Sequence, residues 1–432
     1  METNPFRYGR PIKDLQKFIG RESEMRQILA RLHNSEVESS SVVGERRIGK
    51  TSLLAALKTR LVEDDQSVCA IELDGQLFSH DDAPQSFWER LLQQLSRALP
   101  HNVFRVQIEM LLKMGGLNAH SLSDLFEQLG RAGISIVLLL DEFENIAKNT
   151  NFGADFFYGL RALAMKHNLA LITASYTELI ELCHSDEVRA SPFFNIFASV
   201  HLGPLTTPEA EQFFERYLAQ SGTNFLRDEK DFIYSMAGNH PYYLQVASYF
   251  MFDAYQQGLS AEERQTYTRQ RFTEEAEDTL EHMWRWSTDE EKIALTVLSL
   301  LNASASNEGT ARFSKGKLQD HYTHAGPALK KLVRRGMVVE QRTDYAIFSM
   351  VLADWVRTEL QSTLSDLQTY ETWVKDPANQ TLLARVTDSV KDKVKDQLLP
   401  KLKGAYWELI VSWLTNPATG QAAFELLRSQ LR

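Results

Sequence analysis

The residues between positions 44 and 52 have the types and spacing that bind phosphate groups. One glycine is followed by four other residues and then by Gly-Lys-Thr. Glycines allow turns in which successive backbone N–H groups point to one place, where they bind phosphate oxygens. The lysine adds a positive charge and also serves catalysis, and the threonine hydroxyl is a ligand for Mg²⁺. The predicted phosphate-binding residues are Gly44, Glu45, Arg46, Arg47, Ile48, Gly49, Lys50, Thr51 and Ser52, with Thr51 also assigned to the metal.

The flanking sequence supports this prediction. A short strand is expected at Ser39–Val43 and a helix at Thr51–Leu61. A strand, a glycine-containing loop and a helix in this order aim the helix N-terminus at the phosphates. The alternative is a chance match to the pattern in an ordinary loop. The flanking elements favour the phosphate-binding interpretation.

A second group of chemical residues follows the apolar run Ile136–Leu140, where Asp141 and Glu142 stand together. The carboxyl end of a buried parallel strand is where ligands bind in open α/β sheets. We expect Asp141 to bind Mg²⁺ and Glu142 to polarise the attacking water. The alternative is a solvated strand end. Glu144 is expected to be a surface or pairing residue.

A third position follows the predicted strand Leu169–Ala174. Ser175 stands at its end and has a hydroxyl that could contact the γ-phosphate or the attacking water. Thr173 is the alternative residue for this role. A plain strand end without catalytic function is equally compatible with the sequence.

The elements that would position these residues alternate along the chain. Strands expected at Val68–Leu73, Ile134–Leu140 and Leu169–Ala174 are separated by helical segments. This alternation is typical of an α/β fold with a doubly wound parallel sheet. We therefore assign residues 1–205 to a P-loop nucleotide-binding domain and the helical residues 206–285 to a lid domain.

Residues 286–360 are predicted to form a winged-helix domain. Helices expected at Glu290–Leu301 and Ala325–Arg335 precede two short strands, Met337–Gln341 and Tyr345–Ser349. Helices followed by a β-hairpin are the pattern of a winged helix.

This predicted domain is basic although the chain is acidic. Positions 312 to 342 hold eight basic and two acidic residues, a net charge of +6. Basic side chains on a helix and wing can neutralise DNA phosphates. The alternative is a wing that binds protein or the rest of this chain. The residues proposed for DNA contact are Lys330, Lys331, Arg334 and Arg335.

Residues 361–432 are predicted to form a C-terminal helical bundle. Apolar residues recur there every fourth position, at Leu382, Val386, Val390, Val394 and Leu398. The tryptophans of this segment, Trp373, Trp407 and Trp413, are expected to be core residues. We expect the segment to associate with an identical chain or with an effector protein.

The composition of the chain limits which classes of protein remain possible. The chain has 432 residues, a formal net charge of −10 and two cysteines, so neither a disulfide framework nor a CxxC metal site is expected. The N-terminal residues lack the apolar segment of a signal peptide, and the apolar runs are too short to span a bilayer. These features predict a cytoplasmic protein in a reducing compartment that does not associate with membranes.

Two further motifs resemble a known group of proteins. Phe18-Ile19-Gly20-Arg21-Glu22 resembles the hhGRxxE box that precedes the phosphate loop in AAA+ and STAND ATPases, including the archaeal ATPase and Orc/Cdc6-like groups. The segment 238–244, Gly-Asn-His-Pro-Tyr-Tyr-Leu, resembles the GxP motif of the STAND lid. The resemblance covers roughly residues 15–357. It implies that Gly20, Arg21 and Pro241 lie near the adenine of ATP or ADP.

The chain departs from these relatives at three points. The lid motif is Gly-x-x-Pro, one residue longer than GxP, and a helix-capping turn is the alternative for it. A sensor-2 arginine is not apparent, and His240 is the nearest polar residue. Arg161 and Arg189 are candidates for an arginine finger. We therefore expect hydrolysis to be slow or to depend on a partner or oligomer.

The combined prediction is a STAND/AAA+-like ATPase that acts as a molecular switch in signalling or defence. Its nucleotide state would control oligomerisation or exposure of the C-terminal bundle. The alternative is a DNA-binding AAA+ loader or transposition-type ATPase that uses the basic winged helix. A scaffold with a degenerate site is a third possibility, against which the intact Lys50, Thr51, Asp141 and Glu142 argue.

Overall fold

The computed structural model describes residues 3–34, 37–64, 67–99, 102–219, 221–305, 310–322 and 325–364. Two compact units account for the chain: Tyr8–Gln220, and Met1–Arg7 together with Ser221–Arg432. Each unit is described by itself below. The predicted C-terminal bundle, including its recurring apolar residues and tryptophans, lies almost entirely outside the described residues.

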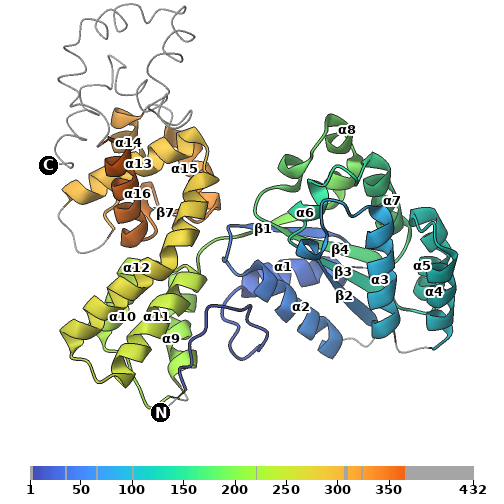
Figure 1. The fold of residues 1–432 in the computed structure, drawn as a ribbon, viewed down its shortest axis with the longest axis horizontal. Helices are drawn as coiled ribbons and strands as arrows, with labels where there is room; N and C mark the ends of the chain where they lie inside the picture. The colour runs from blue at the N-terminus through green and yellow to red at the C-terminus, as the bar shows by residue number, and fades with distance from the viewer. Residues whose placement is uncertain are drawn as a thin grey trace, which may run out of the picture. The chain divides into compact units, whose positions relative to one another are not determined.

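The first unit is built on a five-stranded parallel sheet in the order β2-β3-β4-β1-β5 (Figure 1). The first strand of the chain therefore lies inside the sheet, next to the edge strand β5, and β4 separates it from β3. This arrangement confirms the predicted α/β fold with a doubly wound parallel sheet. The strands are β1 Ser40–Gly44, β2 Val68–Asp74, β3 Ser135–Asp141, β4 Leu169–Ser175 and β5 Ala198–Leu202.

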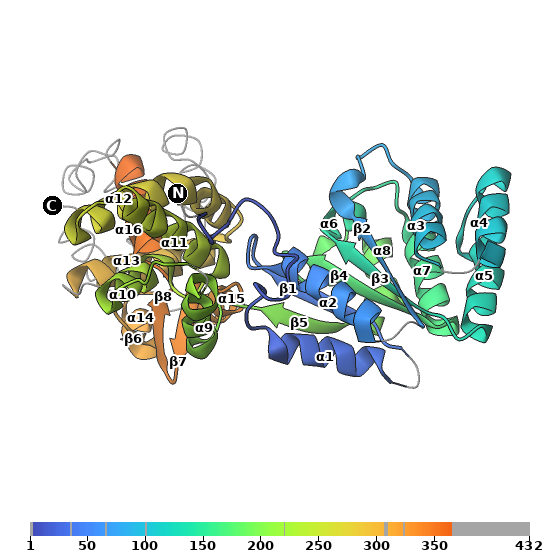
Figure 2. The same cartoon turned by 90° about the horizontal axis from the view of Figure 1, so that it is seen from below.

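Helices cover both faces of this sheet, as Figure 2 shows. α1 and α2 lie on one face, and α3, α5 and α7 lie on the other, where α4 packs on α3 and α5. Neither α4 nor β5 was predicted from the sequence. The helices are α1 Glu22–Leu32, α2 Lys50–Asp64, α3 Pro84–Ala98, α4 Asn102–Met114, α5 Ala119–Arg131, α6 Glu144–Ala147, α7 Ala154–Lys166, α8 Asp186–Arg189 and α9 Thr207–Leu218, with 3-10 turns η1 Gly75–Leu77, η2 Leu179–Leu182 and η3 Pro192–Ile196.

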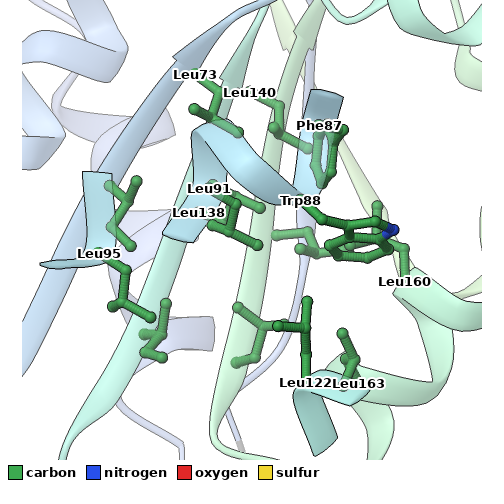
Figure 3. Close-up of a cluster of buried hydrophobic side chains, with 14 of the residues drawn as sticks. Leu73, Phe87, Trp88, Leu91, Leu95, Leu122, Leu138, Leu140, Leu160 and Leu163 are labelled. Carbon is green, nitrogen blue, oxygen red and sulfur yellow. The ribbon is translucent and has the colours of Figure 1, made fainter. Parts of the chain in front are cut away.

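Strand β3 supplies the core on both faces of the sheet. Leu138 and Leu140 pack with Trp88 and other residues of α3 (Figure 3), while Leu139 belongs to the core under α2. Successive side chains of a strand point to opposite faces, so a strand covered on both sides needs an unbroken apolar run. This burial fixes the end of β3, and with it the positions of Asp141 and the turn that follows.

The second unit begins with three helices and continues with a smaller α/β arrangement. Its three-stranded antiparallel sheet has the order β6-β8-β7. A winged helix requires helices with a hairpin in this chain order, and that identification stays a prediction. The sequence analysis missed β6 and α14. The elements are α10 Arg227–Ala237, α11 Pro241–Gln256, α12 Ala261–Arg285, α13 Asp289–Ser304, β6 Phe313–Ser314, α14 Lys315–His321, α15 Ala325–Arg334, β7 Val338–Gln341, β8 Asp344–Ile347 and α16 Met350–Leu364.

The predicted domain boundaries at 205, 285 and 360 stay predictions. The first compact unit extends to Gln220 and includes α9, which the sequence analysis assigned to the lid. Among the described residues, every helix is too short or too polar to cross a membrane.

Candidate functional site

The predicted site residues of the first unit meet at one edge of its sheet. In the strand register, Val43 of β1 lies beside Ser175 of β4, and Thr173 of β4 lies beside Leu140 of β3. The carboxyl ends of β1, β4 and β3 are therefore neighbours. This places Ser175 between the loop that follows β1 and the acidic turn that follows β3.

The loop after β1 needs both of its glycines, for different reasons. Gly49 has a φ of 105°, which a residue with a side chain rarely adopts. A Cβ on Gly44 would lie 2.8 Å from the carbonyl oxygen of Leu202 and 2.9 Å from the side chain of Ile48. Ile48 is fully buried and anchors the loop between them. The backbone shape required for a phosphate cradle is thus present.

Lys50 lies within this loop. Its side chain is buried, and its ammonium group donates to the carbonyl oxygens of Gly44 at 2.9 Å and Glu45 at 3.2 Å. Helix α2 begins at Lys50. The N–H of Leu53 donates a hydrogen bond to the carbonyl of Gly49, just before the helix. The first N–H groups of a helix lack intrahelical acceptors and attract anions. The lysine charge and the helix N-terminus therefore act at the same place.

Asp141 and Thr51 form a pair across the two turns. Burial raises the pKa of Asp141, against a hydrogen bond from the Thr51 hydroxyl that favours its charged form. The neighbouring charge of Glu142 raises this pKa further, while the Glu142 N–H, which donates to the carboxylate at 3.0 Å, and Lys50 lower it. A carboxylate beside a hydroxyl supplies the hard oxygen ligands that Mg²⁺ prefers. These two residues fit a magnesium site.

Glu142 is held in an unusual backbone conformation. Its φ is 48°, which costs of order 1–3 kcal/mol for a residue with a side chain. Three contacts fix the turn. The next residue, Phe143, is buried and its N–H donates to Ala174 of β4 at 3.0 Å. Asn145 N–H donates to the Glu142 carbonyl, which also lies only 2.2 Å from the place of a Cβ on Gly75. Gly75 therefore has to be a glycine for the turn to exist.

The sequence left two expectations for Glu144, a surface residue or a pairing residue. The residue is 7% exposed, so the surface position was wrong. Burial raises its pKa to about 7, and Glu142 raises it through its charge and through a hydrogen bond between the side chains. The Glu144 backbone N–H and the charge of Lys50 act in the opposite direction. The available signal was its place in a short segment whose neighbours Phe143 and Ile146 are apolar and buried.

The structure distinguishes the two hydroxyls of β4 by position. Ser175 is fully buried at the strand end, and its hydroxyl donates to the Thr177 carbonyl at 2.7 Å. Thr173 is also fully buried but lies two residues further inside the strand. Ser175 is thus the better placed of the two, and its role stays a prediction.

Arg21 contacts the phosphate loop from outside. Its buried guanidinium donates to the carbonyls of Ile48 at 3.2 Å and Gly203 at 2.6 Å, and it pairs with Glu24 at 3.2 Å. Burial lowers the pKa of Arg21, and Glu24 opposes this effect. Both Gly20 and Arg21 have positive φ, and Arg21 N–H donates to Glu209 of α9. The GR box therefore fastens the loop backbone, and its proximity to adenine stays a prediction.

The other predicted residues lie on helices of both units: Arg161 on α7 and Arg189 on α8 of the first, and His240 and Pro241 at the start of α11 in the second. Pro241 is the first residue of α11, preceded by the buried His240. Arg161 lies partly buried on α7, whereas Arg189 is exposed on α8 and lies 3.7 Å from Asp186. The proposed contact of Pro241 with adenine, the sensor-2 substitution by His240 and both arginine fingers stay predictions.

Comparison with known proteins agrees with this geometry. The family model described as novel STAND NTPase 2 matches residues 33–303. The chain belongs to this family. As a STAND NTPase it is a P-loop NTPase of the AAA+ group, and the family match covers the phosphate loop, the acidic turn and Ser175.

Two solved structures share the fold of this STAND NTPase. The Walker-type ATPase paby2304 of Pyrococcus abyssi matches with a TM-score of 0.52 and 20% identity, over 81% of this chain and 99% of that one. The ORC2 protein of Aeropyrum pernix, in ADPNP-ADP complexes, matches with a TM-score of 0.51 and 15% identity, over 80% and 94%. None of the curated proteins matches the chain.

Proposed function

We propose that this STAND NTPase is an ATP-hydrolysing molecular switch. The observation that carries the proposal is the meeting of Lys50, the Thr51–Asp141 pair and Glu142 at one edge of the sheet, with Ser175 between the two turns. The P-loop ATPase fold of its structural relatives supports the same reading.

Each residue would have a distinct task. The loop N–H groups and the Lys50 ammonium bind the β- and γ-phosphates. Thr51 and Asp141 hold Mg²⁺, which when bound neutralises charge on the phosphate oxygens. Glu142 accepts a proton from the attacking water. The Ser175 hydroxyl contacts the γ-phosphate or that water, and to donate to either it would release the Thr177 carbonyl to which it now donates.

The second unit would change its position according to which nucleotide is bound. Pro241 starts α11, and we propose that it contacts the adenine as the GxP-like motif implies. A ligand that binds one arrangement of the two units more tightly shifts the population toward that arrangement. In this account, the shift exposes residues 361–432 to an identical chain or to an effector protein.

The switch can be tested separately from hydrolysis. The wild type and Lys50→Ala are incubated with ADP or a non-hydrolysable ATP analogue, and limited proteolysis and light scattering are recorded. The account expects cleavage after residue 360, or particle mass, to differ between nucleotides in the wild type only. Identical results with both nucleotides in the wild type would refute the switch and leave the ATPase assignment standing.

DNA binding is a second candidate, favoured by the charges of α15. Lys330, Lys331 and Arg334 are all exposed on this helix. Arg335 differs from them, because its guanidinium pairs with the buried Glu291 at 3.1 Å and donates to Ser287 at 3.0 Å. We propose that the first three contact DNA phosphates and that Arg335 holds α15 against its neighbours.

Salt-dependent duplex binding tests this candidate. Each lost phosphate contact should reduce the slope of log K against log salt by about 0.9. Neutralising Lys330, Lys331 and Arg334 to Gln should therefore flatten the slope by roughly 2–3. Arg227→Gln, at an exposed position on α10, is the control and should change the slope little. An unchanged slope in the triple variant would exclude α15 as the DNA contact.

A further inference from the structure

Asn149 is a buried amide that the catalytic scheme above does not use. The residue is 7% exposed and lies two positions after α6, the helix that follows the acidic turn. Its side-chain N–H groups donate to the carbonyl oxygens of Ser79 at 3.0 Å and of Asp82 at 3.1 Å. Its side-chain oxygen accepts the N–H of Asn151 at 2.9 Å. The amide therefore connects the residues after α6 to a segment that lies 70 and 67 residues earlier in the chain.

The segment bound by Asn149 is a hydrogen-bonded turn, residues 79–82. The N–H of Asp82 donates to the Ser79 carbonyl at 3.1 Å, and the Asp82 carboxylate accepts the N–H of Ser79 at 2.8 Å. The exposed Asn151 adds a second amide, which donates to the carbonyl oxygens of His80 at 2.9 Å and of Asp82 at 3.3 Å. Three carbonyls of one turn thus accept from two asparagines. We call the two asparagines and this turn the asparagine clasp.

The asparagine clasp lies next in the chain to the residues that contact the acidic turn. The 3-10 turn η1 ends at Leu77, two positions before the clasp, and packs against α6. A Cβ on Gly75, the first residue of η1, would lie 2.2 Å from the Glu142 carbonyl. The backbones of η1 and of the acidic turn therefore touch. A shift of the clasp would move Gly75 relative to Glu142.

The acidic turn needs such a constraint because its backbone is strained. Glu142 has a φ of 48°, and a strained residue keeps its conformation when the surrounding structure over-determines it. One constraint comes from β4, where the Ala174 carbonyl accepts the N–H of Phe143. A second comes from the side of β2, through Gly75. The asparagine clasp fastens this second constraint to the residues after α6.

We propose that Asn149 is a positioning residue for Glu142 and acts through the turn at residues 79–82 and Gly75. This inference rests on the proposed ATPase function. Release of the clasp would let the strained turn relax and would displace the Glu142 carboxylate from the attacking water. The phosphate loop is shaped by its own glycines and by the buried Ile48, so the binding of ATP should persist.

Two substitutions of Asn149 separate donation from shape. Asn149→Ala removes the amide. Asn149→Asp keeps its size and its acceptor oxygen but places a carboxylate oxygen against two carbonyls. Because a misplaced base is costly, both variants should lower kcat by roughly 10- to 100-fold with KM within about threefold.

Asn168→Ala is the matched control for these variants. Asn168 also donates through its amide, to Ser135, but it lies just before β4, at the opposite edge of the same sheet. Its kcat should stay within about threefold of the wild type. Wild-type kcat in a folded Asn149 variant, or an equal loss of kcat in Asn168→Ala, would overturn the proposal.

Hydrogen exchange without nucleotide tests the geometry independently of turnover. The N–H groups of Asn145 and Ile146 donate to the carbonyls of Glu142 and Phe143, so their exchange reports opening of the acidic turn. Exchange there should be about tenfold faster in Asn149→Ala than in the wild type. Unchanged exchange would overturn the proposal.

Asn151→Ala gives the same test if the Asn149 variants do not fold. It removes the exposed amide of the asparagine clasp and should speed exchange in the acidic turn by about threefold, with kcat lowered by a similar factor. Asn168→Ala should leave this exchange unchanged. Exchange in Asn151→Ala that matches the Asn168→Ala control would overturn the proposal.

The two readouts also separate this inference from the function on which it rests. Turnover in the wild type, together with wild-type kcat in the clasp variants, would refute Asn149 as a positioning residue and leave the ATPase standing. Absence of turnover in the wild type would refute the ATPase, and hydrogen exchange would still decide whether Asn149 holds the acidic turn.

Discussion

The two turns at the edge of the first unit's sheet achieve their geometry in different ways. The phosphate loop, residues 44–51, uses backbone groups and depends on glycines and on Lys50 within the same eight residues. The acidic turn, residues 141–144, uses side chains and depends on neighbours from other strands, namely Gly75 after β2 and Ala174 in β4. A loop whose glycines and lysine all lie within eight residues can be recognised from a short pattern, although Leu202 and Arg21 also contact it. A turn held by distant residues cannot.

The comparison predicts that the acidic turn governs turnover and not affinity. Glu142→Gln should reduce kcat by roughly 10²- to 10⁴-fold, because the amide cannot accept the water proton. The Kd for ATP, measured by isothermal titration, should change by less than about threefold. Glu72→Gln, in a half-exposed pair with Lys58, is the control and should leave kcat intact. A large loss of affinity in Glu142→Gln would break the distinction between the two turns.

The phosphate loop should show the reverse behaviour. Lys50→Ala removes a buried charge proposed to face the phosphates, which should weaken ATP binding by roughly 3–5 kcal/mol, or about 10²- to 10⁴-fold. Lys58→Ala, on the same helix but 40% exposed, should change the Kd little. Unchanged affinity in Lys50→Ala, again by calorimetry, would contradict the assignment of this loop.

Gly75 tests the dependence of the acidic turn on a distant strand. A Cβ there would meet the Glu142 carbonyl at 2.2 Å, so Gly75→Ala has to displace the turn. We expect kcat to fall by roughly 10- to 100-fold, since misplacement by about 1 Å can cost that much. Gly153→Ala is the matched control, because a Cβ at Gly153 meets nothing within 4 Å. Equal kcat in both variants would show that the turn tolerates displacement.

The smallest expected effect concerns the stability that Arg21 gives to the phosphate loop. Arg21→Ala leaves the carbonyls of Ile48 and Gly203 without their donor, which should cost roughly 1–3 kcal/mol of unfolding free energy. Arg60→Ala removes only an exposed pair with Glu22 and should cost about 0–1 kcal/mol. Urea-induced unfolding compares the two. Equal costs would mean that Arg21 does not fasten the loop.

The same distinction explains how far the sequence predicted this molecule. Apolar segments identified β2, β3 and β4, because burial leaves a local signal in the sequence. The P-loop pattern identified its own residues and supported the short strand β1 before it. The exposed, alternating β5 and the short β6 have weaker signals and were missed. The insertion of β4 between β1 and β3, which places Ser175 at the site, comes from long-range pairing.

Single charged residues were the hardest to predict. Glu144 was expected to be a surface or pairing residue and Arg335 to contact DNA, yet Glu144 is buried and Arg335 pairs with the buried Glu291. Arg21 was proposed to lie near the adenine. Its guanidinium donates hydrogen bonds to the carbonyls of Ile48 in the loop and of Gly203 after β5. Partners distant in sequence determine the environments of Arg21 and Arg335. For Glu144 a local signal existed, because its neighbours Phe143 and Ile146 are apolar and buried.

The central claim is that this edge of the sheet hydrolyses ATP with Mg²⁺ held by Thr51 and Asp141. The most direct measurement is single-turnover hydrolysis of γ-labelled ATP, with protein in excess, in Mg²⁺ and in excess EDTA. The account predicts first-order phosphate release in Mg²⁺ that is abolished by EDTA and by Glu142→Gln. The claim would be contradicted if the wild type bound ATP but, in Mg²⁺, released phosphate no faster than Glu142→Gln.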